Sequence, residues 1–142
     1  MSKFSDDQLI SIAQQHHDLS VVVAQFRLDR IHGGLPLNDP GIVQLLGLQV
    51  SLSNASASFF AQAAQVTLAD ADKATAQITA ATKAANDAIK TLKVINNVLT
   101  IGSAVGVVVA SVMTGDMNQI AAATKGVFTA ISGQSSLGKS GG

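Results

Sequence analysis

The chain has 142 residues, the length of one ordinary domain, and its nine basic and nine acidic residues cancel, which argues against an electrostatic nucleic acid binder. It contains no cysteine, which excludes disulfides and thiolate chemistry. Charged residues make up 13 % and apolar residues 47 %; an ordinary soluble domain has roughly a quarter charged residues, so the composition favours close helix packing or a membrane encounter over a catalytic cleft.

Two helices are predicted in the first part of the chain. Ser5 and Gln8 have the spacing of a capping box, and apolar residues then recur at helical steps, so the first helix covers about 5–31. A stretch rich in glycine and proline ends it. Asp39 followed by proline reads as an N-cap with proline at the first helical position, and it begins a second, uncharged helix over about 40–68.

A long alanine-rich helix is predicted over 70–113, with Asp70 as its N-cap. A break near 67–72 is expected, although one continuous helix over 40–113 remains open. Small and aliphatic residues keep a heptad spacing, which favours coiled packing of helices. This seam consists of Ala71, Ala74, Ile78, Ala81, Ala85, Ala88, Leu92, Ile95, Leu99, Gly102, Gly106, Val109 and Met113.

An apolar helical hairpin is predicted over 94–131. Its first arm, 94–115, carries no charge and exceeds the roughly 20 residues that a helix needs to cross a bilayer. A turn at 114–116 leads to a second, weaker apolar helix over 117–131. The predicted fold class is therefore all-α: an elongated helical hairpin or bundle in which a long amphipathic helix leads into an apolar hairpin.

The chain ends on a sequence match to a phosphate-binding loop. From Gly133 it reads G-x-x-x-x-G-K-S, but such a loop needs a buried strand before the glycines and a helix after the Lys-Ser pair. Here an apolar helix precedes the match and only two glycines follow it. We therefore predict a single helical domain over 1–132, a flexible tail over 133–142, and no bound nucleotide or other cofactor.

The remaining polar residues favour neither a metal site nor catalysis. His16 and His17 are adjacent, so they point about 100° apart on a helix and cannot hold one ion together. His32 follows in a turn, and a surface or interface position is predicted for all three. Asp70 and Asp72 have the positions of a cap and a favourable dipole partner at a helix start. We therefore predict that the protein is not an enzyme.

Small residues recur on one face of the apolar arm. Gly102, Gly106, Ala110 and Thr114 are spaced four apart, which lets helix backbones approach closely in lipid, and equally inside a soluble bundle. Adjacent asparagines at its start suit a segment that is packed away in one state and inserted in another. The predicted membrane and assembly residues are Val94, Leu99, Gly102, Gly106, Val108, Val109, Ala110 and Met113.

A long amphipathic helix leading into an apolar hairpin, over about 71–131, resembles the architecture of the α-helical pore-forming toxins of the cytolysin A and haemolysin BL type. The resemblance implies a soluble form that hides the hairpin, followed by oligomerisation and insertion; the short chain suits one component of a multipart system. The expected partners are a lipid bilayer and further copies or a partner subunit. The expected location is secreted without a cleavable signal or membrane-associated, with cytoplasmic assembly left open. The alternative is a structural protein that forms filaments or sheets without a membrane.

Overall fold

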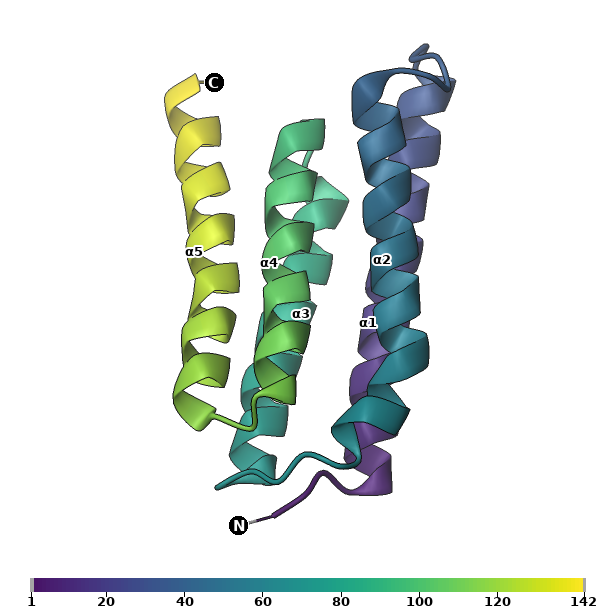
Figure 1. The fold of residues 1–142 in the computed structure, drawn as a ribbon. Helices are drawn as coiled ribbons and strands as arrows, with labels where there is room; N and C mark the ends of the chain where they lie inside the picture. The colour runs from purple at the N-terminus through teal and green to yellow at the C-terminus, as the bar shows by residue number, and fades with distance from the viewer. Residues whose placement is uncertain (1, 142) are drawn as a thin grey trace.

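The computed structural model describes the backbone of residues 2–141 and the side chains of residues 2–133. Within that range the protein is all-α, as predicted, and contains no β-strand; one isolated bridge joins Ser2 to Leu68. The chain runs up and down through an elongated bundle (Figure 1). Its helices are α1 (Asp6–His32), α2 (Pro40–Ala63), α3 (Ala71–Thr91), α4 (Ile95–Met113) and α5 (Met117–Gly141).

Four of the helices form a closed bundle and the fifth covers one side of it. The helix α1 packs on α2 and α3, and α4 packs on α2 and, less extensively, on α3. The helix α5 lies along α3 and α4 (Figure 1). Each helix therefore buries an apolar stripe against two or more neighbours, which is how amphipathic helices obtain most of their stability.

The predicted helix starts are confirmed by their caps. The Ser5 hydroxyl accepts from the Gln8 N–H while the Gln8 side chain accepts from the Ser5 N–H, which completes the capping box. The Asp39 carboxylate accepts from two backbone N–H groups at the start of α2, and Asp70 does the same for the N–H of Lys73. The turn between α4 and α5 contains Gly115 at φ 71°, where glycine avoids the strain of a side chain.

The prediction of one helix over 70–113 is wrong. The chain leaves the helical conformation at Leu92 and Val94, both extended, so that α3 and α4 fold back against each other. The Arg30 guanidinium of α1 donates to the Lys93 carbonyl oxygen at 3.0 Å and fixes this break. No glycine or proline marks the position in the sequence, and the contact with Arg30 comes from a distant part of the chain.

Two other helix ends differ from the predicted ones. The break expected near 67–72 is confirmed, but α2 ends earlier, at Ala63, because the following segment is drawn into pairing with the N-terminus. Ser2 and Leu68 exchange backbone hydrogen bonds, and the Leu68 side chain is buried. At the other end of the molecule, α5 continues past the expected limit near 131 to Gly141. The flexibility predicted for 133–142 is not tested by the helix assignment and stays a prediction.

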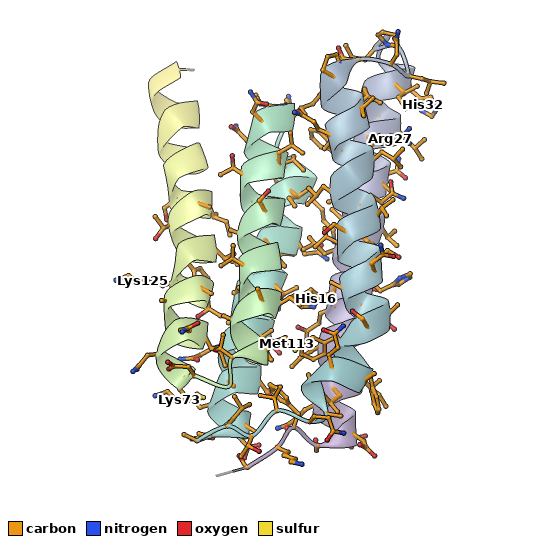
Figure 2. All side chains as sticks on the ribbon, viewed as in Figure 1. His16, Arg27, His32, Lys73, Met113 and Lys125 are labelled. Carbon is orange, nitrogen blue, oxygen red and sulfur yellow. The ribbon has the colours of Figure 1, made fainter. Side chains whose placement is uncertain are left out.

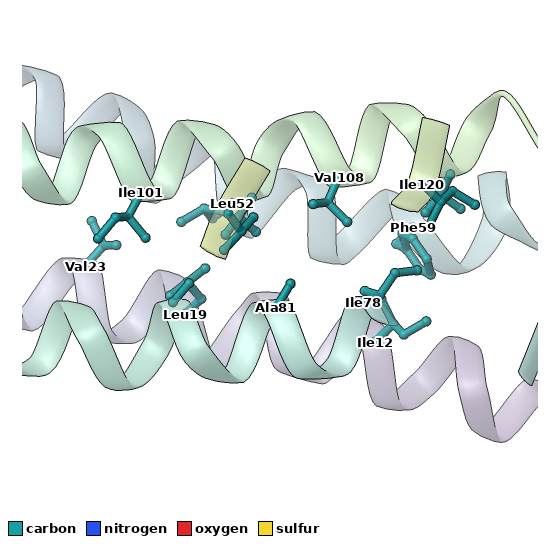
Figure 3. Packing of buried hydrophobic residues seen from close by; sticks show 14 of the residues in the cluster. Ile12, Leu19, Val23, Leu52, Phe59, Ile78, Ala81, Ile101, Val108 and Ile120 are labelled. Carbon is teal, nitrogen blue, oxygen red and sulfur yellow. The ribbon is translucent and has the colours of Figure 1, made fainter. Parts of the chain in front are cut away.

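The core runs the length of the bundle and draws on every helix. Figure 3 shows Ile12 near Ile78, and Leu19 and Val23 facing the helices that carry Leu52 and Ile101. The aromatic ring of Phe59 lies at one end of this core and contacts Phe4 with a centroid distance of 6.1 Å. The apolar seam predicted for the first half of the alanine-rich helix is confirmed, since Ala71, Ala74, Ile78, Ala81 and Ala85 are all buried.

Candidate membrane and assembly surface

The apolar helix α4 buries a different face from the predicted one. Its buried residues are Val98, Ile101, Gly102, Val105, Val108, Ser111 and Val112. Of the predicted seam only Gly102 belongs to this set, while Gly106 is exposed and Leu99, Val109 and Met113 are half-buried. The physical reason is the break before α4, which resets the helical phase, so a heptad counted through the break no longer marks the buried side.

The two predicted glycines have unlike surroundings. A Cβ atom on Gly102 would overlap the Leu48 side chain of α2, lying 2.8 Å from Cδ1 and 3.1 Å from Cγ. A Cβ on Gly106 would meet nothing within 4 Å. At the start of α2, a Cβ on Gly41 would lie 2.9 Å from the Ile95 Cδ1. Glycine at 41 and 102 thus lets α2 and α4 approach closely, whereas Gly106 is free on the surface.

Val108 also differs from its predicted setting. It belongs to the predicted membrane and assembly residues, but it is buried in the bundle core and only 1 % exposed (Figure 3). Its neighbour Val107 is instead 58 % exposed. Of the other predicted residues, Val94 and Ala110 are exposed. The predicted set is therefore split between the core and the surface and forms no single face.

Charge is distributed unevenly between the helices. No charged residue occurs in α2 or α4, and the side chains of α5 that the structure describes, 117–133, include one charged group, Lys125. The charged side chains of the other helices lie on α1 and α3, which are joined by polar contacts such as Gln8 to Asp72 at 2.7 Å and Gln15 to Thr79 at 3.1 Å. Since α2 and α4 pack side by side, they form an uncharged layer that faces away from the charged helices. In Figure 1 this layer lies in front of α1 and α3.

The uncharged layer exposes large apolar side chains. On α2, exposed residues recur at steps of three and four and form an outer stripe: Val43, Leu46, Val50, Ser53, Ala57 and Phe60. On α4 and the described side chains of α5 the exposed large apolar residues are Val107 and Phe128. The helix α1 also exposes three aliphatic residues, but on a helix that carries charges. Contiguous apolar surface of this kind marks a site of contact with protein or membrane.

Two shallow grooves border the exposed ridge of α4. The groove against α2 has a volume of about 400 Å³, and its lining includes Gly47, Ser51 and Gly106. The groove against α5 has a volume of about 450 Å³, and its lining includes Ala110 and Ala122. Small residues on both walls keep the grooves open to another helix or to acyl chains. The sequence could indicate the small residues, but not that α2 and α4 would be neighbours.

A third groove, larger than these two, lies at the end of the bundle where the chain passes from α3 to α4. It has a volume of about 830 Å³, and its charged lining residues are Asp29, Arg30 and Lys93. Its described lining contains neither histidine nor a hydroxyl or thiol side chain. Within the described part of the chain, no cluster of three or more potential ligands is placed to hold a metal ion.

One histidine does not have the predicted position. His17 and His32 are exposed, but His16 is buried, because it occupies the same helical face as Ile12 and Leu19. Burial lowers the pKa of His16. The hydrogen bond between its ring and the Ile12 carbonyl raises the pKa, but by less than burial lowers it. The sequence contained a signal for this, since the apolar spacing of the first helix passes through residue 16.

The glycine-rich match at the end of the chain lies in a helical backbone. The helix α5 runs through residues 133–141, whereas a phosphate-binding loop needs a strand and an irregular turn before its helix. The side chain of Lys139 lies outside the described residues. The absence of nucleotide binding stays a prediction.

Length and composition set α4 apart from the other described helices. It alone is long and apolar enough to cross a bilayer, with a mean hydropathy of 1.8 over its most apolar window, of which 39 % is buried in the bundle. No known family, curated protein or solved structure matches the chain. The function therefore has to be argued from the geometry of this molecule.

Proposed function

We propose that the protein is a membrane-active, self-associating helical bundle, one component of a pore-forming system, that engages a bilayer through its uncharged layer and inserts the α4–α5 hairpin. The observation that carries the proposal is the segregation of charge. The layer formed by α2 and α4 has no charged side chain, exposes Val107 and the outer stripe of α2, and contains a helix long enough to span. An uncharged face can enter a bilayer without the cost of burying ions.

Insertion requires α4 to leave α2. The contact between Gly102 and Leu48 is the closest approach of these helices at a glycine, and it must be lost when the hairpin moves into lipid. The soluble bundle is then the form that hides the buried face of α4, and the membrane replaces α2 and α3 as its apolar surroundings. This sequence of events is the one that the resemblance to α-helical toxins implies.

A reversible cross-link between α2 and α4 tests this directly. The chain has no cysteine, so Leu48→Cys with Gly102→Cys gives a unique thiol pair. A Cβ at 102 would lie 3.1 Å from the Leu48 Cγ, which marks where the sulfur of a cysteine at 48 can lie. In a disulfide the Cβ of one cysteine lies roughly 3 Å from the sulfur of the other, so the pair can form. We expect dye release from phosphatidylcholine and phosphatidylglycerol vesicles to stop in the oxidised variant and return on reduction. Equal release in both states would show that α4 does not separate from α2.

A charge placed on the layer gives an independent test. Val107→Lys puts an ammonium near the middle of α4 at an exposed position, where the soluble bundle tolerates it. At the bilayer centre the same charge costs at least roughly 2.5 kcal/mol, so vesicle leakage should fall strongly. The matched control is Ala76→Lys, which adds the same charge at an exposed site on α3. If both variants leak like the wild type, the inserting hairpin is refuted.

The second candidate function is lipid-free self-assembly, and the outer stripe of α2 favours it. Six exposed residues at heptad spacing on an uncharged helix have the pattern of a coiled-coil seam that no helix of the same chain covers. A second copy presents the same stripe without charge repulsion. Electron microscopy of the lipid-free protein should then show ordered polymers that Val50→Lys abolishes and Ala76→Lys does not. A monomeric wild type at high concentration would exclude this candidate.

A further inference from the structure

His16 is the one described histidine inside the bundle, and its two ring nitrogens have different environments. Nδ1 lies 2.8 Å from the Ile12 carbonyl oxygen, which can only accept, so Nδ1 carries the proton. Nε2 is buried and has no hydrogen-bond partner. The ring stacks on Phe59 of α2, with centroids 6.0 Å apart and planes 15° from parallel. Figure 2 shows His16 in the interior of the bundle.

No charged side chain of the described residues is placed to stabilise an imidazolium here. The helices α2 and α4 carry no titratable side chain at all. The charged groups of α3 are all exposed at the surface, as are Asp18 on α1 and Lys125 on α5; those of α3 are Asp72, Lys73, Lys83, Asp87 and Lys90. The titratable neighbour on α1, His17, is exposed as well. A proton added to Nε2 would thus create a buried cation without a charged partner and a buried donor without an acceptor.

We propose that His16 is an acid-sensitive latch of the bundle, and that protonation of Nε2 separates α1 from the Phe59 face of α2 and loosens the core. The cation can be hydrated only if this packing opens. Phe59 is a central part of that packing, since it also contacts Phe4 and is 1 % exposed. The latch acts at one point of the contact between α1 and α2, and α2 is in turn one of the helices that pack on α4.

The direction of the pH dependence follows from the geometry. Burial holds the pKa of His16 below its ordinary value of about 6.5, so between the two values the unfolded chain binds a proton that the folded bundle does not. Stability is therefore complete above about pH 6.5 and is lost as the pH falls below it. Each pH unit in that window lowers the folding equilibrium constant by up to about tenfold.

The test compares urea unfolding of wild type, His16→Leu and His17→Gln between pH 7.5 and 5.5, above the range in which most carboxyl groups titrate. We expect the wild-type folding constant to fall by up to about tenfold on acidification, with the same fall in His17→Gln. His16→Leu should lose most of that fall. His16→Gln keeps a polar side chain that does not titrate, and it should behave like His16→Leu. Agreement between these two variants would show that the lost pH dependence does not come from a packing defect in His16→Leu. An equal fall in all four proteins would overturn the latch.

The membrane consequence rests on the proposed function and is measured separately, as dye release from the same vesicles at pH 7.5 and 5.5. Release that rises in acid for wild type but not for His16→Leu supports both proposals. A pH-dependent folding constant without any release keeps the latch and refutes membrane insertion. Release that is equal at both pH values, with a folding constant that does not depend on His16, refutes the latch and leaves insertion standing.

Discussion

Alanine should stabilise the bundle at Gly106 but not at Gly102. In a helix interior alanine is favoured over glycine by about 1 kcal/mol, and at Gly106 the added methyl meets nothing within 4 Å, so we expect a gain of about that size. At Gly102 the same gain is offset by overlap with Leu48, and overpacking typically costs about 1–3 kcal/mol. The net result ranges from no change to a loss of about 2 kcal/mol.

Urea unfolding followed by circular dichroism measures both variants, and the double variant Gly102→Ala with Leu48→Ala isolates the overlap. We expect the two substitutions to interact favourably by about 1 kcal/mol or more, because the shortened side chain at 48 makes room for the methyl group. If Gly102→Ala stabilises the protein as much as Gly106→Ala does, the close approach of α2 and α4 is refuted. The two glycines also differ in what a leucine there would test. Gly106→Leu probes contacts between molecules, whereas Gly102→Leu disturbs the packing of the monomer itself.

Three other predictions follow from single positions. Val108→Lys should unfold the bundle or lower its free energy of unfolding by more than about 3 kcal/mol, because it buries an unpaired charge. Val107→Lys should change that free energy by less than about 0.5 kcal/mol, and thermal melts of the two variants test the difference. Gly115→Ala should cost at least about 1 kcal/mol through its left-handed φ of 71°, and equal melting temperatures would contradict this. Titration calorimetry with ATP should show no saturable binding, and binding abolished by Lys139→Ala would restore the phosphate-loop interpretation.

The parts of the fold that depend on neighbouring residues could be predicted from the sequence. The caps at Ser5, Asp39 and Asp70 and the turn at Gly115 are local, since a side chain or a backbone angle within a few residues decides each one. The buried face of α1 also follows from its spacing. These features depend only on residues close together in the chain and on the regular spacing of a helix.

The break at 92–94 could not be predicted, because its cause is a contact made by Arg30, far away in the sequence. Its consequence is larger than the break itself, since it shifts the phase of every residue in α4. That shift moved Val108 into the core and left Gly106 on the surface. The uncharged layer was missed for a similar reason: the lack of charge in each segment is visible in the sequence, but the packing of α2 against α4 is not.

The role of Arg30 in fixing the break can itself be tested. Its guanidinium donates to the Lys93 carbonyl oxygen at 3.0 Å and lies 4.8 Å from the ring centroid of Phe26. Arg30→Met keeps an apolar stem against Phe26 and removes the donor. A hydrogen bond of this kind contributes about 1 kcal/mol, so amide exchange in the first turn of α4, at Asn97 and Val98, should accelerate about fivefold.

The matched control is Lys90→Met, which removes one exposed positive charge from the last turn of α3. Exchange at Asn97 and Val98 should stay near the wild-type rate in this variant, and exchange at Ile120 in α5 should stay unchanged in both. Only three residues separate α3 from α4, so the local opening should be confined to this break. Equal acceleration in Arg30→Met and Lys90→Met would mean that charge near the break, and not the bond to Lys93, fixes the break between the two helices.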